Sequence, residues 1–103
     1  MLAASCGRGE SAQQYVQRGM DLYEQGNLVK ARLEFKNALQ IDPKTADAWF
    51  MLGEIAEQEQ EWRSAYSSYG KTVELAPDNR EARIKLGTLL VAGNRIDEAL
   101  AEA

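Results

Sequence analysis

Apolar residues recur at spacings of three and four along most of the chain, the periodicity of an amphipathic helix. Short polar breaks divide this pattern into segments that each cover a few helical turns. The predicted helices lie near residues 12–25, 28–41, 46–59, 62–75, 80–92 and 95–103. Helices of this length are marginal in water on their own, so packing between them must supply the stability. The pattern therefore predicts an all-α fold.

The same pattern repeats along the chain with a shift of 34 residues. The residues that coincide under this shift are Gly19, Gly53 and Gly87; Ala31, Ala65 and Ala99; and Pro43 and Pro77. A glycine inside a helix costs roughly 1 kcal/mol relative to alanine, so three of them at one period indicate a steric need. We expect a neighbouring helix to approach closely there, with the three alanines as the small facing residues.

The boundaries of the repeats follow from residues that interrupt or cap helices. Proline cannot continue a helix, so Pro43 and Pro77 mark the turns between repeats. Inside the repeats, the stops are predicted at Gly26-Asn27, at Gly93-Asn94 and, with weaker turn chemistry, at Gln60-Glu61. The spacing of a capping box occurs twice, at Ser11 with Gln14 and at Asp78 with Glu81.

One repeat unit carries most of a known signature, Trp49-x2-Leu52-Gly53, then Ala65-x3-Tyr69, then Pro77. This arrangement resembles the tetratricopeptide repeat family. The resemblance implies a right-handed superhelical solenoid of antiparallel helix hairpins. The expected division is a flexible lead over 1–11, repeats over 12–45 and 46–79, and a partial repeat over 80–103.

The resemblance also implies a concave groove, lined by the first helix of each repeat, that holds a protein or peptide. The groove positions carried onto this sequence are Val16, Met20, Tyr23, Asp47, Phe50, Met51, Glu54, Glu57, Glu81, Ile84 and Lys85. Val16, Phe50 and Ile84 share one register and are expected to form an apolar stripe bordered by acidic residues. Such a surface suits a partner with apolar anchors and basic flanks. The alternative is that the stripe packs between helices and touches no partner.

Composition removes several classes of function. The formal net charge of -4 disfavours nucleic acid, because phosphate contact needs a basic surface. There is no histidine and only one cysteine, so neither a Ser-His-Asp or Cys-His site nor a zinc site of Cys and His can be built. We therefore expect no catalytic residues, no metal and no cofactor, and a binding scaffold that is not an enzyme.

Two other functions remain open. The last predicted helix is short and no polar capping helix follows it, so the end near Leu90, Ile96 and Leu100 could mediate self-association into dimers or stacks. The chain could also serve as an accessory segment of a larger enzyme.

The N-terminus offers one candidate modification site. Small residues from Leu2 to Ser5 precede Cys6, as at the end of a bacterial lipoprotein signal, although no charged start or long apolar stretch comes before them. If Cys6 is lipidated, the protein is membrane-anchored and faces the periplasm, and it then resembles repeat lipoproteins of pilus assembly or exopolysaccharide export. Otherwise Cys6 is an ordinary thiol in a cytoplasmic protein.

Overall fold

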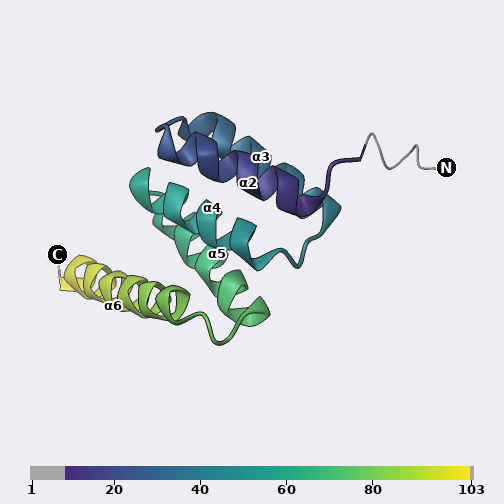
Figure 1. The fold of residues 1–103 in the computed structure, drawn as a ribbon. Helices are drawn as coiled ribbons and strands as arrows, with labels where there is room; N and C mark the ends of the chain where they lie inside the picture. The colour runs from purple at the N-terminus through teal and green to yellow at the C-terminus, as the bar shows by residue number, and fades with distance from the viewer. Residues whose placement is uncertain (1–8, 103) are drawn as a thin grey trace.

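The computed structural model describes residues 9–102, with side chains up to Gly93. Within that range it contains five helices and no strand, so the all-α prediction is confirmed (Figure 1). The helices are α2 (Ala12–Glu24), α3 (Leu28–Ile41), α4 (Ala46–Gln58), α5 (Trp62–Leu75) and α6 (Arg80–Glu102). None of the described helices is both long enough and apolar enough to cross a membrane.

The helices pair as antiparallel hairpins in the order of the sequence. α2 packs along α3 and α4 packs along α5, while fewer contacts join the two hairpins through α3 and α4. α6 then packs on α5, which continues the stack (Figure 1). This is the hairpin solenoid that the 34-residue period predicts.

The two repeat glycines at Gly19 and Gly53 are places of close helix approach, as predicted, but their facing residues differ from the prediction. A Cβ atom built on Gly19 would lie 2.6 Å from the ring of Phe35, and one built on Gly53 would lie 2.6 Å from the ring of Tyr69. The second helix of each hairpin thus lays an aromatic ring on the glycine. The expected alanines, Ala31 and Ala65, are fully buried but are not the nearest neighbours of the glycines.

The turns inside the first two hairpins share one left-handed residue in register. Gly26 has φ +82° and Gln60 has φ +60°, so the weaker turn chemistry of the second repeat still gives the same backbone path. After the first turn, Asn27 accepts a hydrogen bond from the Lys30 N–H and caps α3, as predicted.

The two predicted capping boxes have different outcomes. At the start of α2 both hydrogen bonds of the Ser11–Gln14 box are present. The box predicted at Asp78 is wrong, because the side chain of the next residue, Asn79, accepts the hydrogen bond from the Ala82 N–H. The helix therefore begins one residue later than the Asp78–Glu81 spacing indicated.

The break predicted at Gly93–Asn94 is wrong, because α6 runs continuously from Arg80 to Glu102. Glycine and asparagine together cost a helix interior only about 1–2 kcal/mol relative to alanine, which does not force a break. In the first two hairpins the second helix, α3 or α5, packs on the first helix and so stabilises the turn between them. In the third repeat the residues equivalent to the second helix instead continue α6.

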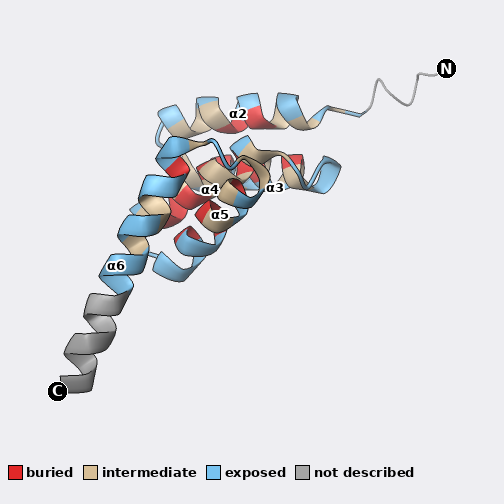
Figure 2. Ribbon diagram, turned by 90° about the horizontal axis from the view of Figure 1, so that it is seen from below, coloured by how far each residue is buried: buried red, intermediate tan, exposed pale blue. Residues whose placement is uncertain are grey.

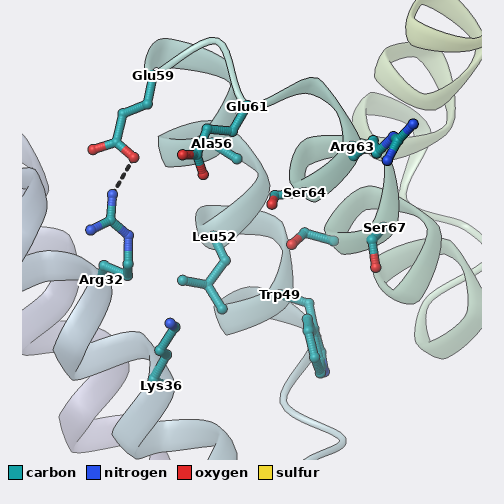
Figure 3. A pocket seen from close by; sticks show the side chains of 11 residues that line it. Arg32, Lys36, Trp49, Leu52, Ala56, Glu59, Glu61, Arg63, Ser64 and Ser67 are labelled. Atoms are coloured by element: carbon teal, nitrogen blue, oxygen red, sulfur yellow. Dashed lines mark hydrogen bonds and ion pairs between the residues drawn. The ribbon is translucent and has the colours of Figure 1, made fainter.

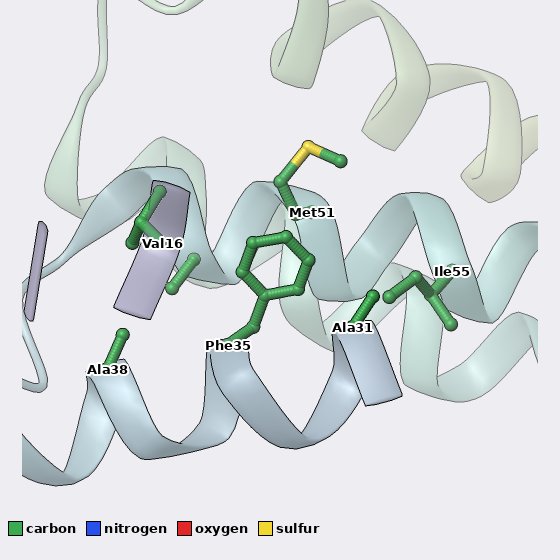
Figure 4. Close-up of a cluster of buried hydrophobic side chains, with 7 residues drawn as sticks. Val16, Ala31, Phe35, Ala38, Met51 and Ile55 are labelled. Atoms are coloured by element: carbon green, nitrogen blue, oxygen red, sulfur yellow. The ribbon is translucent and has the colours of Figure 1, made fainter. Parts of the chain in front are cut away.

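The core consists of two clusters, of which the first joins the two hairpins through α2, α3 and α4 and the second lies between α4 and α5. The first contains Val16, Ala31, Phe35, Ala38, Ala48, Met51 and Ile55 (Figure 4). The second contains Ala56, Ala65 and Tyr69. Figure 2 shows the buried positions gathered where α2, α3, α4 and α5 face one another, while the described part of α6 is mostly exposed. The placement of Val16 and Met51 in the core bears directly on the candidate site.

Candidate functional site

The helices α2, α4 and α6 each begin a repeat, and they present a common surface that we call the first-helix face. Four of the predicted groove residues, Tyr23, Glu54, Glu57 and Lys85, meet there in one polar network. Tyr23 is on α2, the two glutamates are on α4 and Lys85 is on α6. The network therefore joins three helices that are far apart in the sequence.

Lys85 is the centre of this network. Its Nζ lies 3.3 Å from Glu54 Oε2 and 3.2 Å from Glu57 Oε1, so one ammonium group bridges two carboxylates. The same Nζ lies 5.7 Å from the centroid of the Tyr69 ring, within the range of a cation–π interaction. Burial alone would lower the pKa of Lys85, but the hydrogen bonds and charges of the two glutamates outweigh it, so the pKa is raised.

Glu57 has a second partner below the surface. The Tyr69 hydroxyl donates a 2.7 Å hydrogen bond to Glu57 Oε1. This bond is the main reason that the pKa of Glu57 is lowered, with Lys85 contributing in the same direction against the effect of burial. Burial and the same carboxylate raise the pKa of the Tyr69 phenol, so Tyr69 stays a neutral donor at physiological pH.

Tyr23 closes the network on the α2 side. Its hydroxyl donates to Glu54 Oε1 at 3.5 Å and accepts a hydrogen bond from Gln58 Nε2. Burial, followed by the charge of Glu54, raises the pKa of Tyr23. The polar side chains of this face are thus held by one another, which fixes their positions before any partner arrives.

The apolar stripe expected along the groove is only partly exposed. Val16 is 1% exposed and Met51 is 9% exposed, so neither can contact a partner, and their assignment to the groove surface is corrected. Both residues belong to the first core cluster, because each lies on the side of its helix that packs against the neighbouring helices. Phe50 is half-buried against both clusters and lies 5.6 Å from the Tyr69 ring, whereas Ile84 is 61% exposed.

The remaining groove candidates lie outside the network. Met20 is half-buried against the first core cluster. Asp47 and Glu81 are exposed at the start of α4 and α6, in the first helical turn. They add negative charge to the first-helix face without contacting Lys85. Cys6, the candidate lipidation site, lies outside the described residues.

Tyr69 was not among the predicted groove residues, so its part in the site was missed. Its ring is buried, but its hydroxyl reaches Glu57. The signal was available in the repeat alignment, where Tyr69 coincides with Phe35. A buried tyrosine hydroxyl needs a polar partner that a phenylalanine does not, so the second repeat had to supply one.

The five helices and the polar network on the first-helix face define a helical repeat protein. The sequence profile described as "TPR repeat" matches residues 19–60. Together with the hairpin geometry and the relatives below, this match shows that the chain belongs to the tetratricopeptide repeat family.

The chain is similar to several curated proteins with different names. The type IV pilus assembly protein PilF of Pseudomonas aeruginosa is 36% identical over 95 residues, which cover 90% of this chain and 37% of PilF. The peroxisomal targeting signal receptor of Candida albicans is 39% identical over 69 residues, covering 66% of this chain and 12% of the receptor. The human protein O-mannosyl-transferase TMTC1 is 31% identical over 85 residues, covering 82% of this chain and 9% of the transferase.

In each case the chain spans only a small part of the relative. Even for PilF the matched share is 37% of its length. The comparisons therefore concern a matched segment and not the whole length of these relatives.

Proposed function

We propose that this chain is a protein-interaction scaffold whose first-helix face binds a segment with an apolar anchor and basic flanks. The observation that carries the proposal is the network in which Glu54 and Glu57 share the single cation Lys85. Two carboxylates against one ammonium leave a net negative charge fixed on this face. A lysine or arginine of a partner would complement that charge.

The apolar anchor has a place beside this charge. Ile84 is exposed one residue before Lys85, and Phe50 is half-buried on the neighbouring α4. A partner side chain seated against Ile84 would lie next to the carboxylates that Lys85 bridges. Because Tyr23, Gln58 and Tyr69 hold these carboxylates in place, little ordering is needed on binding.

Ile84 is the residue of choice for a test. Phe50 packs against both core clusters, so an acidic substitution there would perturb folding as well as binding. The probe is a short peptide with one leucine flanked by lysines, compared with the same peptide flanked by glutamates. Ile84 is 61% exposed, so a partner can newly bury about three-fifths of its side chain, whose full burial contributes about 1.5–3 kcal/mol. Ile84→Ser should therefore weaken binding of the lysine-flanked peptide about fivefold to twentyfold.

The matched control is Leu33→Ser on α3, because Leu33 is 58% exposed and lies away from the first-helix face. Both variants should keep the parent melting temperature, and only Ile84→Ser should weaken binding. Binding should also fall with added salt, since exposed charges are screened beyond about 8 Å at physiological ionic strength. Equal binding of the glutamate-flanked peptide would refute the proposal.

Self-association is a second candidate function, and the outer surface of α6 favours it. Leu90 and Val91 are more than half exposed, and a Cβ built on Gly87 would meet nothing within 4 Å. At the equivalent Gly19 and Gly53 an aromatic ring covers the helix. Sedimentation over a wide concentration range tests this function, and a strict monomer would exclude it.

The network suits charge pairing better than general-acid catalysis. The hydrogen bond from Tyr69 lowers the pKa of Glu57, so Glu57 is ionised at neutral pH and cannot act as a general acid. We infer that the carboxylates serve recognition, also where the chain forms part of a larger enzyme.

A further inference from the structure

A second surface, on the opposite side of α4 from the network, is hollowed out. A cleft of about 830 Å³ opens between α3 and α5, and we call it the α3–α5 cleft (Figure 3). Its walls and floor are formed by Arg32 and Lys36 of α3, Ser64 and Ser67 of α5, and Trp49 and Leu52 of α4. None of these residues belongs to the first-helix face.

The cleft is open because the α5 wall consists of small side chains. Ser64, Ser67 and Ser68 all line it. Under the 34-residue shift they coincide with Lys30, Leu33 and Glu34 of the first repeat, which are all longer. The second repeat therefore differs from the first in leaving a space lined by hydroxyl groups above α4.

The charges of the cleft are opposite in sign to those of the whole chain. Arg32 is paired with Glu59 near the α4–α5 turn, so that end is locally neutral (Figure 3). Lys36 and Arg63 also line the cleft, and within the described side chains neither forms an ion pair. Glu61 adds one negative charge, again close to the turn. The cleft is thus net positive in a chain of formal charge -4. Lys36 lies at the end of the cleft away from Glu59 and Glu61 (Figure 3).

The floor of the cleft is rigid and apolar. The Trp49 indole N–H donates a 2.9 Å hydrogen bond to the Pro43 carbonyl, which fixes the ring and uses its only donor. Leu52 lies beside it on α4, pointing into the opening in Figure 3. An apolar side chain of a partner could pack on Trp49 and Leu52 while an acidic neighbour reaches Lys36.

We propose that the α3–α5 cleft binds an acidic protein segment, with a carboxylate paired to Lys36 or Arg63 and an apolar side chain on Trp49 and Leu52. The first-helix face selects a basic segment and this cleft selects an acidic one. The second repeat can therefore hold two partners of opposite charge on opposite sides of α4. The two sites share no residue, so the cleft does not depend on the proposed function of the first-helix face.

Trp49 provides the readout for the experiment. A Trp62→Phe background leaves Trp49 as the single tryptophan, and its fluorescence is followed while a peptide is added. The probe is a short peptide with one leucine flanked by glutamates, compared with glutamine-flanked and lysine-flanked versions. The glutamate-flanked peptide should give a saturable change that the other two do not.

Two variants locate the site. Lys36→Glu exchanges an attraction for a repulsion and should weaken binding about tenfold. Ser67→Leu introduces the residue that the first repeat has at Leu33, fills the cleft and should abolish binding. The matched control is Lys30→Glu, the same charge change on the same helix at a residue that does not line the cleft.

Several outcomes would overturn the proposal. One is the absence of saturation up to a peptide concentration of about 1 mM, equivalent to about 4 kcal/mol of binding free energy. Another is equal weakening by Lys30→Glu and Lys36→Glu, which would indicate unspecific charge attraction. Displacement of the peptide by a lower concentration of a single-stranded oligonucleotide would assign the cleft to nucleic acid instead. Ile84→Ser should leave this binding unchanged, so failure here and failure at the first-helix face are distinguishable.

Discussion

A methyl group added at Gly53 tests the tightest helix contact of the second hairpin. In Gly53→Ala the new Cβ would lie 2.6, 2.8 and 3.0 Å from three carbon atoms of the Tyr69 ring. Carbon atoms in contact prefer about 3.5–4.0 Å, so the ring must move by about 1 Å. Tyr69 is fully buried and its hydroxyl is bound to Glu57, which leaves it little room to retreat.

The size of the effect follows from two opposing contributions. Overpacking of this kind costs about 1–3 kcal/mol, and alanine recovers about 1 kcal/mol of helix propensity. With three ring atoms in close contact we expect a net loss near the upper limit, about 1–2 kcal/mol. For a domain of this size that loss lowers the melting temperature by roughly 4–16 °C.

The control is the same substitution at the equivalent glycine of α6. A Cβ on Gly87 would meet nothing within 4 Å, so Gly87→Ala should gain up to about 1 kcal/mol from propensity alone. Urea unfolding followed by far-ultraviolet circular dichroism measures both variants against the parent chain. If Gly53→Ala were as stable as the parent, or if Gly87→Ala lost as much stability as Gly53→Ala, the steric explanation of the repeat glycines would be refuted.

Three further predictions concern the polar groups. Tyr69→Phe removes the hydrogen-bond donor to Glu57 and should lower the free energy of unfolding by about 1.5–3 kcal/mol. The pKa of Glu57, measured by NMR titration, should rise. An unchanged pKa would contradict the hydrogen bond between Tyr69 and Glu57. The pKa of Glu57 is lowered in the folded state, so ionised Glu57 contributes to the free energy of unfolding. This contribution is complete above the unfolded-state pKa of about 4.5 and is lost as the pH falls through the folded-state pKa. Glu57→Gln should remove that part of the acid dependence of the urea midpoint. Asn79→Ala should cost about 1 kcal/mol in thermal unfolding, while Asp78→Ala should change stability by less than about 0.5 kcal/mol; the reverse order would restore the capping box at Asp78.

The repeat period predicted the helices and their pairing because it reports steric requirements that recur in every hairpin. It predicted exposure less well, because exposure depends on the neighbours of each repeat. Val16 and Ile84 share one register, yet Val16 is 1% exposed and Ile84 is 61% exposed. α4 and α3 cover the side of α2 that carries Val16, while Ile84 lies on a face of α6 that no described helix covers.

The polar network was only half predictable for a related reason. Register placed Glu54, Glu57 and Lys85 on first helices, but it gave no distances between helices. Whether Lys85 meets one glutamate or two depends on how α6 packs on α5, which contacts distant in sequence determine. The α3–α5 cleft was not predicted, because nothing in the sequence marks it except three short side chains where the first repeat has long ones.

The pairing of each helix with its neighbour in sequence also has a kinetic consequence. Most packing inside a hairpin joins residues separated by one short turn, so each hairpin can assemble from local contacts, and chains of low contact order fold fast. The interfaces between hairpins involve fewer residues than those within them. A pulling force applied at the two ends should therefore peel the array apart hairpin by hairpin, in steps, without a single cooperative rupture.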